Sequence, residues 1–143
     1  MSENLSFVRT NSSLTPVTIG FNRSLLLGAD SSRLNGSFSK LLSKAGFSVT
    51  RGRNGRSCFE LAMMSEQFSR PFDLVLLDSR LPGLDGPSTA LLLRQNGFCE
   101  PIVMIVDGRG RSEIEECLEL GCNDCIQLAD LEGRIFEILE RIL

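Results

Sequence analysis

Asp78 is the residue of this sequence whose position first suggests chemistry. It ends the apolar run 74–77, and a Pro-Gly and an Asp-Gly dipeptide follow it at 82–83 and 85–86. A short apolar run bounded by turn signals is typical of a strand covered on both faces of a parallel sheet. Such sheets bind ligands beyond the C-terminal ends of their strands. Asp78 is therefore a candidate functional carboxylate, although a lone aspartate at this place can also serve only to cap the next turn.

Composition excludes several classes of protein. The chain has 143 residues, 42% of them hydrophobic and 23% charged, which predicts one soluble domain with a full core. Its formal net charge of −3 offers no basic surface for nucleic acid or anionic lipid. No apolar run approaches the ~20 residues that span a bilayer, and the first residues lack the pattern of a signal peptide. We expect a cytoplasmic protein that binds neither nucleic acid nor membrane.

The cysteines and the absence of histidine narrow the chemistry further. The chain has five cysteines and no histidine. An odd number without a secretory signal favours reduced thiols. Cys122 and Cys125 form a CxxC with Cys117 upstream, but a closed zinc site would also need Cys58 or Cys99, so metal or redox chemistry is disfavoured there. Without histidine, the commonest general base and the usual serine or cysteine triads are excluded.

Hydrophobic periodicity divides the chain into a leader and five strand-helix alternations. Residues 1–22 are rich in Ser, Thr and Asn and predict a flexible leader or linker before a domain at 23–143. The predicted strands are 24–28, 47–50, 73–77, 101–106 and 124–128. The predicted helices are 32–45, 55–68, 88–95, 112–121 and 131–143.

The fourth predicted helix carries a specific start signal. Ser112 and Glu115 have the spacing of a capping box. The apolar positions of the same helix predict that Ile114, Cys117 and Leu118 are buried.

The alternation of strands and helices predicts the fold class. It calls for an α/β protein with a doubly wound, five-stranded parallel sheet in the order 2-1-3-4-5 and helices on both faces. Three uses of such a sheet fit poorly. The first strand is followed by neither the Gly- and Thr-rich phosphate loop of a flavodoxin nor the G-x-G-x-x-G of a nucleotide-binding Rossmann protein. A phosphatase of the haloacid dehalogenase type would carry a second aspartate where this chain has Arg80.

A fourth use fits the spacing. The segment "DLVLLDSRLPGLDG" (73–86) closely resembles the phosphoacceptor segment of response-regulator receiver domains, in which the aspartate ending the third strand takes a phosphoryl group from a histidine kinase. The resemblance covers roughly residues 24–143. Its other markers are "LLSKAGFSVTRGRNG" (41–55), "PIVMI" (101–105) and "GCNDCI" (121–126). It implies the flavodoxin-like receiver fold.

The resemblance also implies a cation site next to the acceptor. Receiver domains pair the phosphoacceptor with acidic residues after the first strand, because Mg²⁺ must offset the charge on the phosphoryl oxygens. The matching segment "LLLGADSS" places Asp30 at the second acidic position and Ala29 at the first. Asp78, Asp30 and the backbone carbonyl of Arg80 are the implied ligands. One carboxylate is missing, so we expect weakened Mg²⁺ binding.

Other positions depart from the receiver pattern. Val106 stands where the resemblance implies a Thr or Ser that bonds the phosphoryl oxygen, and Leu128 stands where it implies a lysine. Cys125 replaces the aromatic switch residue. Arg80 and Asp107 border the predicted mouth of the site, and Arg80 could pair with Asp78 in place of the lysine.

These residues predict a receiver domain of a two-component phosphorelay with a degenerate site. Asp78 would accept a phosphoryl group inefficiently from a histidine kinase or phosphotransfer protein, as a signalling phosphoprotein rather than a turnover enzyme. The alternative is a pseudo-receiver that works as a phosphorylation-independent interaction module. The family's output face is formed by helix four, strand five and helix five, here the segments "EIEECLE" and "CIQL" with the last helix.

Overall fold

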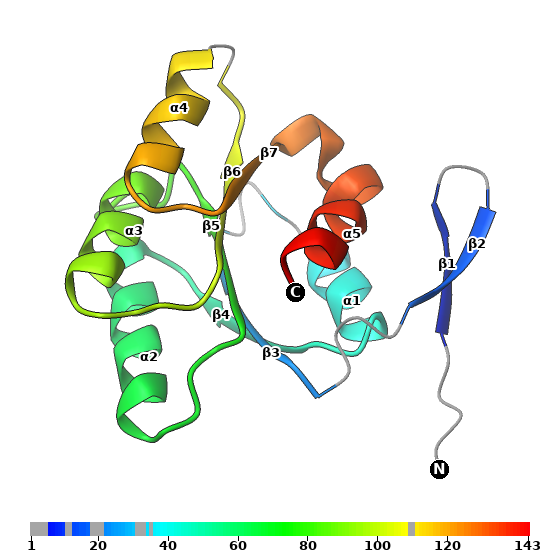
Figure 1. The fold of residues 1–143 in the computed structure, drawn as a ribbon, viewed down its shortest axis with the longest axis horizontal. Coiled ribbons are helices and arrows are strands. Elements are labelled where there is room, and N and C mark those ends of the chain that lie inside the picture. The colour runs from blue at the N-terminus through cyan, green and yellow to red at the C-terminus, as the bar shows by residue number, and fades with distance from the viewer. Residues whose placement is uncertain (1–5, 11–12, 18–21, 31–33, 35, 109–110) are drawn as a thin grey trace.

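A five-stranded parallel sheet organises the domain (Figure 1). The computed structural model spans residues 1–143 and describes residues 6–10, 13–17, 22–30, 34, 36–108 and 111–143. The strands of this sheet are β3 (Ser24–Gly28), β4 (Ser48–Gly52), β5 (Leu74–Asp78), β6 (Ile102–Val106) and β7 (Asp124–Gln127). Their order is β4-β3-β5-β6-β7, which confirms the predicted order 2-1-3-4-5.

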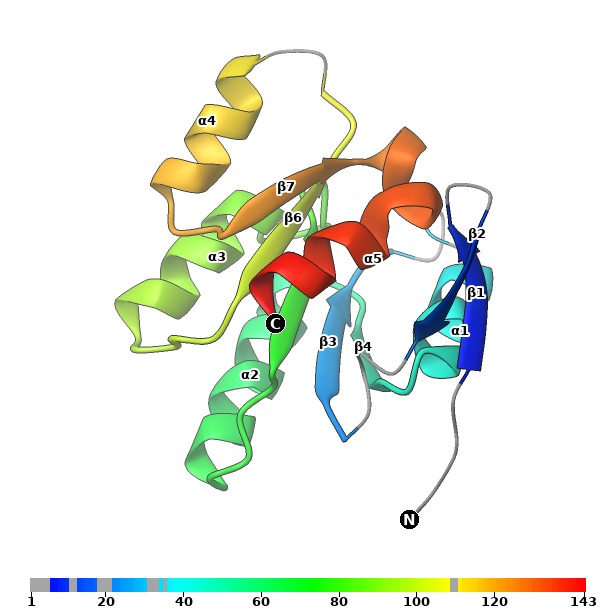
Figure 2. The same cartoon turned by 45° about the vertical axis from the view of Figure 1, so that its right-hand side comes forward.

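Helices cover both faces of the sheet, as the alternation predicts. The helices are α1 (Gly36–Lys44), α2 (Gly55–Gln67), α3 (Gly86–Gln95), α4 (Arg111–Glu119) and α5 (Leu131–Ile142), with a 3₁₀ turn η1 (Leu128–Asp130) before α5. Figures 1 and 2 show α2, α3 and α4 on one side of the sheet and α1 and α5 on the other. No described helix is long and apolar enough to cross a membrane.

The core has two layers because successive strand residues point to opposite faces. Leu25 and Leu27 of β3 belong to the layer under α1 and α5, where Phe38 and Ile135 are fully buried. Leu26 belongs to the opposite layer, under α2, α3 and α4. Every residue of β5 and β6 is buried, whereas the edge strands β4 and β7 are only partly covered. The continuous apolar runs of the sequence thus mark the inner strands.

Two local caps set where helices next to the site begin. The side chain of Asn54 accepts a 2.8 Å hydrogen bond from Ser57 N–H at the start of α2. Asp85 accepts a hydrogen bond of the same length from Ser88 N–H at the start of α3. Both are N-cap residues in extended conformation, which satisfy amide groups that the first helical turn leaves unpaired. Asn54 and Asp85 therefore determine where α2 and α3 begin.

The segment predicted as a flexible leader contains regular backbone pairing. β1 (Ser6–Thr10) and β2 (Ser13–Val17) form an antiparallel hairpin that is a two-stranded sheet of its own (Figure 2). No strand was predicted there, because the stretch lacks a sustained alternation of apolar and polar residues. The division between residues 22 and 23 stays a prediction.

The start and burial of α4 correct two further predictions. The helix begins at Arg111, so Ser112 lies inside its first turn and is not the N-cap of a capping box. Cys117 is fully buried as predicted, but the side chain of Leu118 is 44% exposed. Neighbouring positions on a helix point about 100° apart, so packing through Cys117 turns Leu118 toward solvent.

Candidate functional site

The C-terminal ends of β3, β5 and β6 bring the predicted site residues to one edge of the sheet. Gly28 of β3 pairs in register with Leu77 of β5. Ala29 therefore continues beside Asp78, and Asp30 follows it at the same edge. On the other side, Asp78 pairs with Ile105 of β6. The parallel register is what assembles these residues, which are far apart in the sequence.

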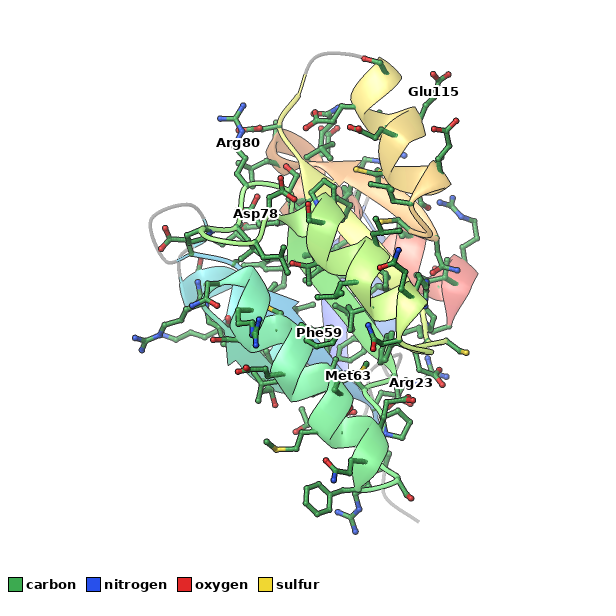
Figure 3. All side chains as sticks on the ribbon, turned by 90° about the vertical axis from the view of Figure 1, so that its left-hand side faces the viewer. Arg23, Phe59, Met63, Asp78, Arg80 and Glu115 are labelled. Atoms are coloured by element: carbon green, nitrogen blue, oxygen red, sulfur yellow. The ribbon has the colours of Figure 1, made fainter. Side chains whose placement is uncertain are left out.

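Asp78 is the last residue of the central strand, and its side chain is fully buried. The backbone N–H of Arg80 donates a 3.1 Å hydrogen bond to Oδ1 of Asp78. The N–H of Ser79 bonds to the carbonyl of Ile105 at 2.8 Å, which extends the pairing of β5 with β6 past Asp78. Figure 3 shows Asp78 at the strand end with Arg80 just beyond it. The backbone that follows Asp78 thus binds one oxygen of its carboxylate.

Two glycines allow the loop after Asp78 to close tightly. Gly83 has φ +72°, in the left-handed region that a side chain disfavours. A Cβ atom at Gly86 would lie 2.4 Å from the carbonyl oxygen of Asp78, closer than real Cβ atoms approach. Gly83 and Gly86, from the Pro-Gly and Asp-Gly pairs of the sequence, are thus structural requirements of the loop after Asp78.

The carboxylate oxygens at this edge are ligands of the type that Mg²⁺ prefers, but there are few of them. Asp30 is half-buried and Asp78 is buried. Ala29, which precedes Asp30 in the chain, is fully buried and brings no carboxylate. Among the described residues, no group of three or more His, Cys, Asp or Glu side chains is placed to hold a metal ion. Mg²⁺ in proteins is commonly held by one or two carboxylates together with substrate phosphates. Asp30, Asp78 and the Arg80 carbonyl could therefore hold it.

The positions predicted to be degenerate carry apolar side chains in the structure. Val106 ends β6 and is fully buried. It pairs in register with Gln127, and Leu128 follows at the start of η1, partly buried against the layer under α1 and α5. Neither side chain offers a hydroxyl or an ammonium group. Cys125 lies half-buried in β7 and packs against the layer under α4.

Arg80 makes an ion pair that the sequence did not identify. Its Nε lies 3.2 Å from Oδ1 of Asp107, and its side chain is 62% exposed. The hydrogen bond between Arg80 and Asp78 comes from the backbone. Pairing of the guanidinium with Asp78 in place of a lysine stays a prediction. Both charges were visible in the sequence, but only the register of Asp78 with Ile105 shows that each stands two residues beyond a paired strand position.

The cysteines are free thiols in the described structure. Cys117 of α4 and Cys125 of β7 share a side-chain hydrogen bond, with Cys122 nearby. Burial is the main cause that raises the pKa of all three, that of Cys122 to about 12. Burial likewise raises the pKa of Cys58 to about 12. Protonated thiols are poor nucleophiles and poor metal ligands, so these residues act as packing groups.

Together, the sheet order and the helices on both faces define a doubly wound α/β domain, with a buried aspartate at the end of its central strand. The family model of the response regulator receiver domain matches residues 26–132. The chain belongs to this family.

Relatives and solved structures agree with this assignment. The chain is 33% identical over 107 residues to the transcriptional regulatory protein QseB of Escherichia coli O157:H7. This match covers 70% of this chain and 45% of QseB. It is 31% identical over 121 residues to the probable transcriptional regulatory protein SilR of Salmonella typhimurium, covering 82% of this chain and 51% of SilR. The chain thus spans about half the length of these curated relatives.

A structural neighbour carries a metal in the corresponding fold. The receiver domain of sensor histidine kinase PA1611 from Pseudomonas aeruginosa superposes with a TM-score of 0.68 and 28% identity, covering 84% of this chain and 96% of that one. In that structure a magnesium ion is coordinated in the active site cleft.

Proposed function

We propose that this receiver domain accepts a phosphoryl group on Asp78, slowly, from a histidine kinase or phosphotransfer protein. The observation that carries the proposal is the position of the Asp78 carboxylate. It ends the central strand at the edge where Asp30 also lies, and Oδ1 is held by the N–H of Arg80. A carboxylate held at this edge of the sheet can act as the nucleophile in an in-line attack on phosphorus.

The transfer would be a simple displacement. A bond forms between a carboxylate oxygen of Asp78 and phosphorus, while the P–N bond of a phosphohistidine breaks and its electron pair stays on the ring, so that an imidazole already protonated on its other nitrogen leaves neutral. The Arg80 N–H keeps the carboxylate oriented during the attack. Mg²⁺, held by Asp30, Asp78 and the Arg80 carbonyl, would supply positive charge against the phosphoryl oxygens.

Three features would make the reaction slow. Asp78 is fully buried, so the donor must displace part of the loops above it. Ala29 removes one carboxylate from the cation site, which weakens Mg²⁺ binding. Val106 and Leu128 provide neither a hydroxyl nor a cation for the developing charge, and preorganised groups of this kind are usually the largest contribution to such catalysis.

The same features favour one second candidate, a pseudo-receiver that signals by contact alone. Its interaction surface would be α4, β7 and α5. Among the described side chains of α4, Glu115, Glu116, Glu119 and Leu118 are exposed. This surface suits a partner with basic and apolar side chains. Because the curated relatives are regulators about twice as long, we further propose that the domain serves a regulatory output carried elsewhere in a longer protein.

The deciding experiment is phosphorylation in vitro. The purified chain is incubated with acetyl phosphate and Mg²⁺, and the added phosphoryl group is followed by intact-protein mass and located by peptide mapping. We expect partial modification at one site, abolished by Asp78→Asn. Asp85→Asn is the matched control, because Asp85 is an exposed aspartate of the same loop that caps α3. Absence of modification in the unaltered chain, and in variants with the site restored, would leave the pseudo-receiver.

A further inference from the structure

Arg80 and Asp107 form an ion pair just past the ends of β5 and β6, next to the strand end that carries Asp78. Asp78 and Ile105 are register partners at the ends of β5 and β6, and each member of the ion pair lies two residues further along its chain. The pair therefore joins the loop after β5 to the loop after β6 across the mouth of the site. Figure 3 shows Arg80 extending beyond the strand end that carries Asp78.

The side chains of Arg80 and Asp107 differ in their exposure to solvent. The Arg80 side chain is 62% exposed. The Asp107 side chain is 26% exposed, and its Oδ1 atom, which faces the guanidinium, is shielded from water. The cation is thus the more exposed member of the pair. A cation beside a phosphoacceptor is the group that the apolar side chain at Leu128 fails to supply.

We infer that Arg80 is the residue that contacts the transferred phosphoryl group, and that Asp107 is its resting partner and competes with the phosphoryl oxygens for it. This inference rests on the proposed function of Asp78. The guanidinium can donate two parallel hydrogen bonds to a phosphoryl group, which carries more negative charge than a single carboxylate. Arg80 leaves Asp107 as the phosphoryl group arrives.

The free energy of the Arg80–Asp107 ion pair limits how much this pair can slow the phosphorylation of Asp78. Ion pairs with one exposed member contribute at most about 1 kcal/mol, which corresponds to a rate factor of about two to five. Asp107 therefore tunes the reaction and does not block it. Loss of the arginine should cost more, about tenfold. That is less than the 10²–10³ found for donors in water-excluded sites, because Arg80 is mostly exposed.

A double-mutant cycle on the full chain tests this assignment. The variants are Asp107→Asn, Arg80→Gln and the two combined, each incubated with acetyl phosphate and Mg²⁺, with initial rates measured by intact-protein mass. Asp107→Asn should raise the rate about twofold to fivefold, and Arg80→Gln should lower it about tenfold. In the Arg80→Gln background, Asp107→Asn should have little effect because there is no guanidinium left to release. Arg80→Lys should recover part of the rate.

The controls separate this mechanism from simpler ones. If Asp107→Asn raises the rate equally in both backgrounds, Asp107 acts only by repelling the anionic donor and the assignment of Arg80 is overturned. Glu60→Gln breaks a comparable exposed ion pair, Arg56–Glu60 at 3.1 Å, and should change nothing. Modification of Asp78 with no response to either substitution overturns the inference alone. No modification in any variant overturns the proposed function together with it.

Discussion

Ala29 continues the pairing of β3 with β5 one residue past Gly28 and Leu77, so its buried methyl group lies beside the Asp78 strand end. The backbone N–H of Ala29 is bonded to the carbonyl of Gly52 at 3.1 Å, which fixes this position in the sheet edge. An apolar residue therefore occupies the place beside Asp78 where the receiver pattern has a carboxylate. This arrangement lowers the repulsion around Asp78 and also lowers the attraction for a cation.

Ala29→Asp should strengthen Mg²⁺ binding by about tenfold or more, because it adds a full negative charge to the cation site. Without Mg²⁺ the same change should lower the free energy of unfolding by about 2–4 kcal/mol, since a buried charge then faces Asp30 and Asp78. NMR titration measures the first effect, because the chain has no Trp or Tyr. Urea unfolding with and without Mg²⁺ measures the second.

Ala29→Asn is the matched control, since it adds the size and polarity of the side chain without its charge. It should destabilise the domain and leave Mg²⁺ affinity almost unchanged. Equal Mg²⁺ affinity of Ala29→Asp and the unaltered chain would show that Asp30 and Asp78 do not form a cation site.

Restoring the two missing polar groups should accelerate phosphorylation. Val106→Thr with Leu128→Lys supplies a hydroxyl and an ammonium at the ends of β6 and β7, where they can face the phosphoryl oxygens. We expect the initial rate with acetyl phosphate to rise at least about tenfold. The unmodified variant should be about 1–2 kcal/mol less stable, because the new hydroxyl lies in a fully buried position. An unchanged rate in a variant that urea unfolding shows to be folded would contradict the predicted geometry.

Much of the fold was predictable, because strands that are buried on both faces of a sheet appear in the sequence as continuous apolar runs. β5 and β6 are continuous apolar runs whose every residue is buried, so their positions and order followed from the sequence. The pairing of β1 with β2 was missed because residues 1–22 lack the sustained apolar alternation from which strands are predicted. The side on which α4 packs was partly missed, because both Cys117 and Leu118 satisfy the helical period and only packing decides between them.

The candidate site was predictable in position and less so in its contacts. The place of Asp78 at the end of an apolar run followed from the sequence, and the structure has it as the last residue of β5. The partner of Arg80 did not follow, because three aspartates, at positions 30, 78 and 107, end up near the same edge. The choice depends on loop geometry and on the desolvation of each carboxylate, which no local sequence pattern encodes.

Arg94 should be the most important charged residue for stability. Its guanidinium donates hydrogen bonds to the carbonyls of Gly121, Phe98 and Glu100 and to the side chain of Asn123, at 2.7–3.0 Å. It thereby ties the end of α3 to the turns before β6 and β7. Arg94→Gln should lower the free energy of unfolding by about 2–4 kcal/mol, because several carbonyl groups lose a charged donor.

Urea unfolding followed by circular dichroism measures this loss. Arg56→Gln is the control, since Arg56 makes only an exposed ion pair with Glu60 and should cost less than about 1 kcal/mol. Similar values for the two variants would contradict the structural role of Arg94.

Alkaline pH should destabilise the domain through its buried thiols. Burial raises the pKa of Cys58 from 9.0 to about 12, so the folded state keeps a proton that the unfolded chain loses. The stability from this group is complete below pH 9 and falls by up to about 1.4 kcal/mol per pH unit as the pH rises toward 12. Urea unfolding at several pH values above 9 should show a smaller slope for Cys58→Ala. A slope unchanged by that substitution would contradict the assignment.

Phosphorylation of Asp78 should move the α4, β7 and α5 surface only slightly. A modification shifts a conformational equilibrium only by the difference of its interactions with the two states. Val106 and Leu128 give the phosphoryl oxygens no polar partner that would draw β6 and β7 toward the site. Cys125 bonds to Cys117 of α4 and provides no aromatic ring that could change rotamer.

Amide chemical shifts measured with and without acetyl phosphate should change near Asp78 and remain nearly constant in α4, β7 and α5. The variant with Val106→Thr and Leu128→Lys should show changes across that surface, and Asp78→Asn should show none. Large shifts in α4 and α5 of the unaltered chain that disappear in Arg80→Gln would instead show that Arg80 transmits the signal.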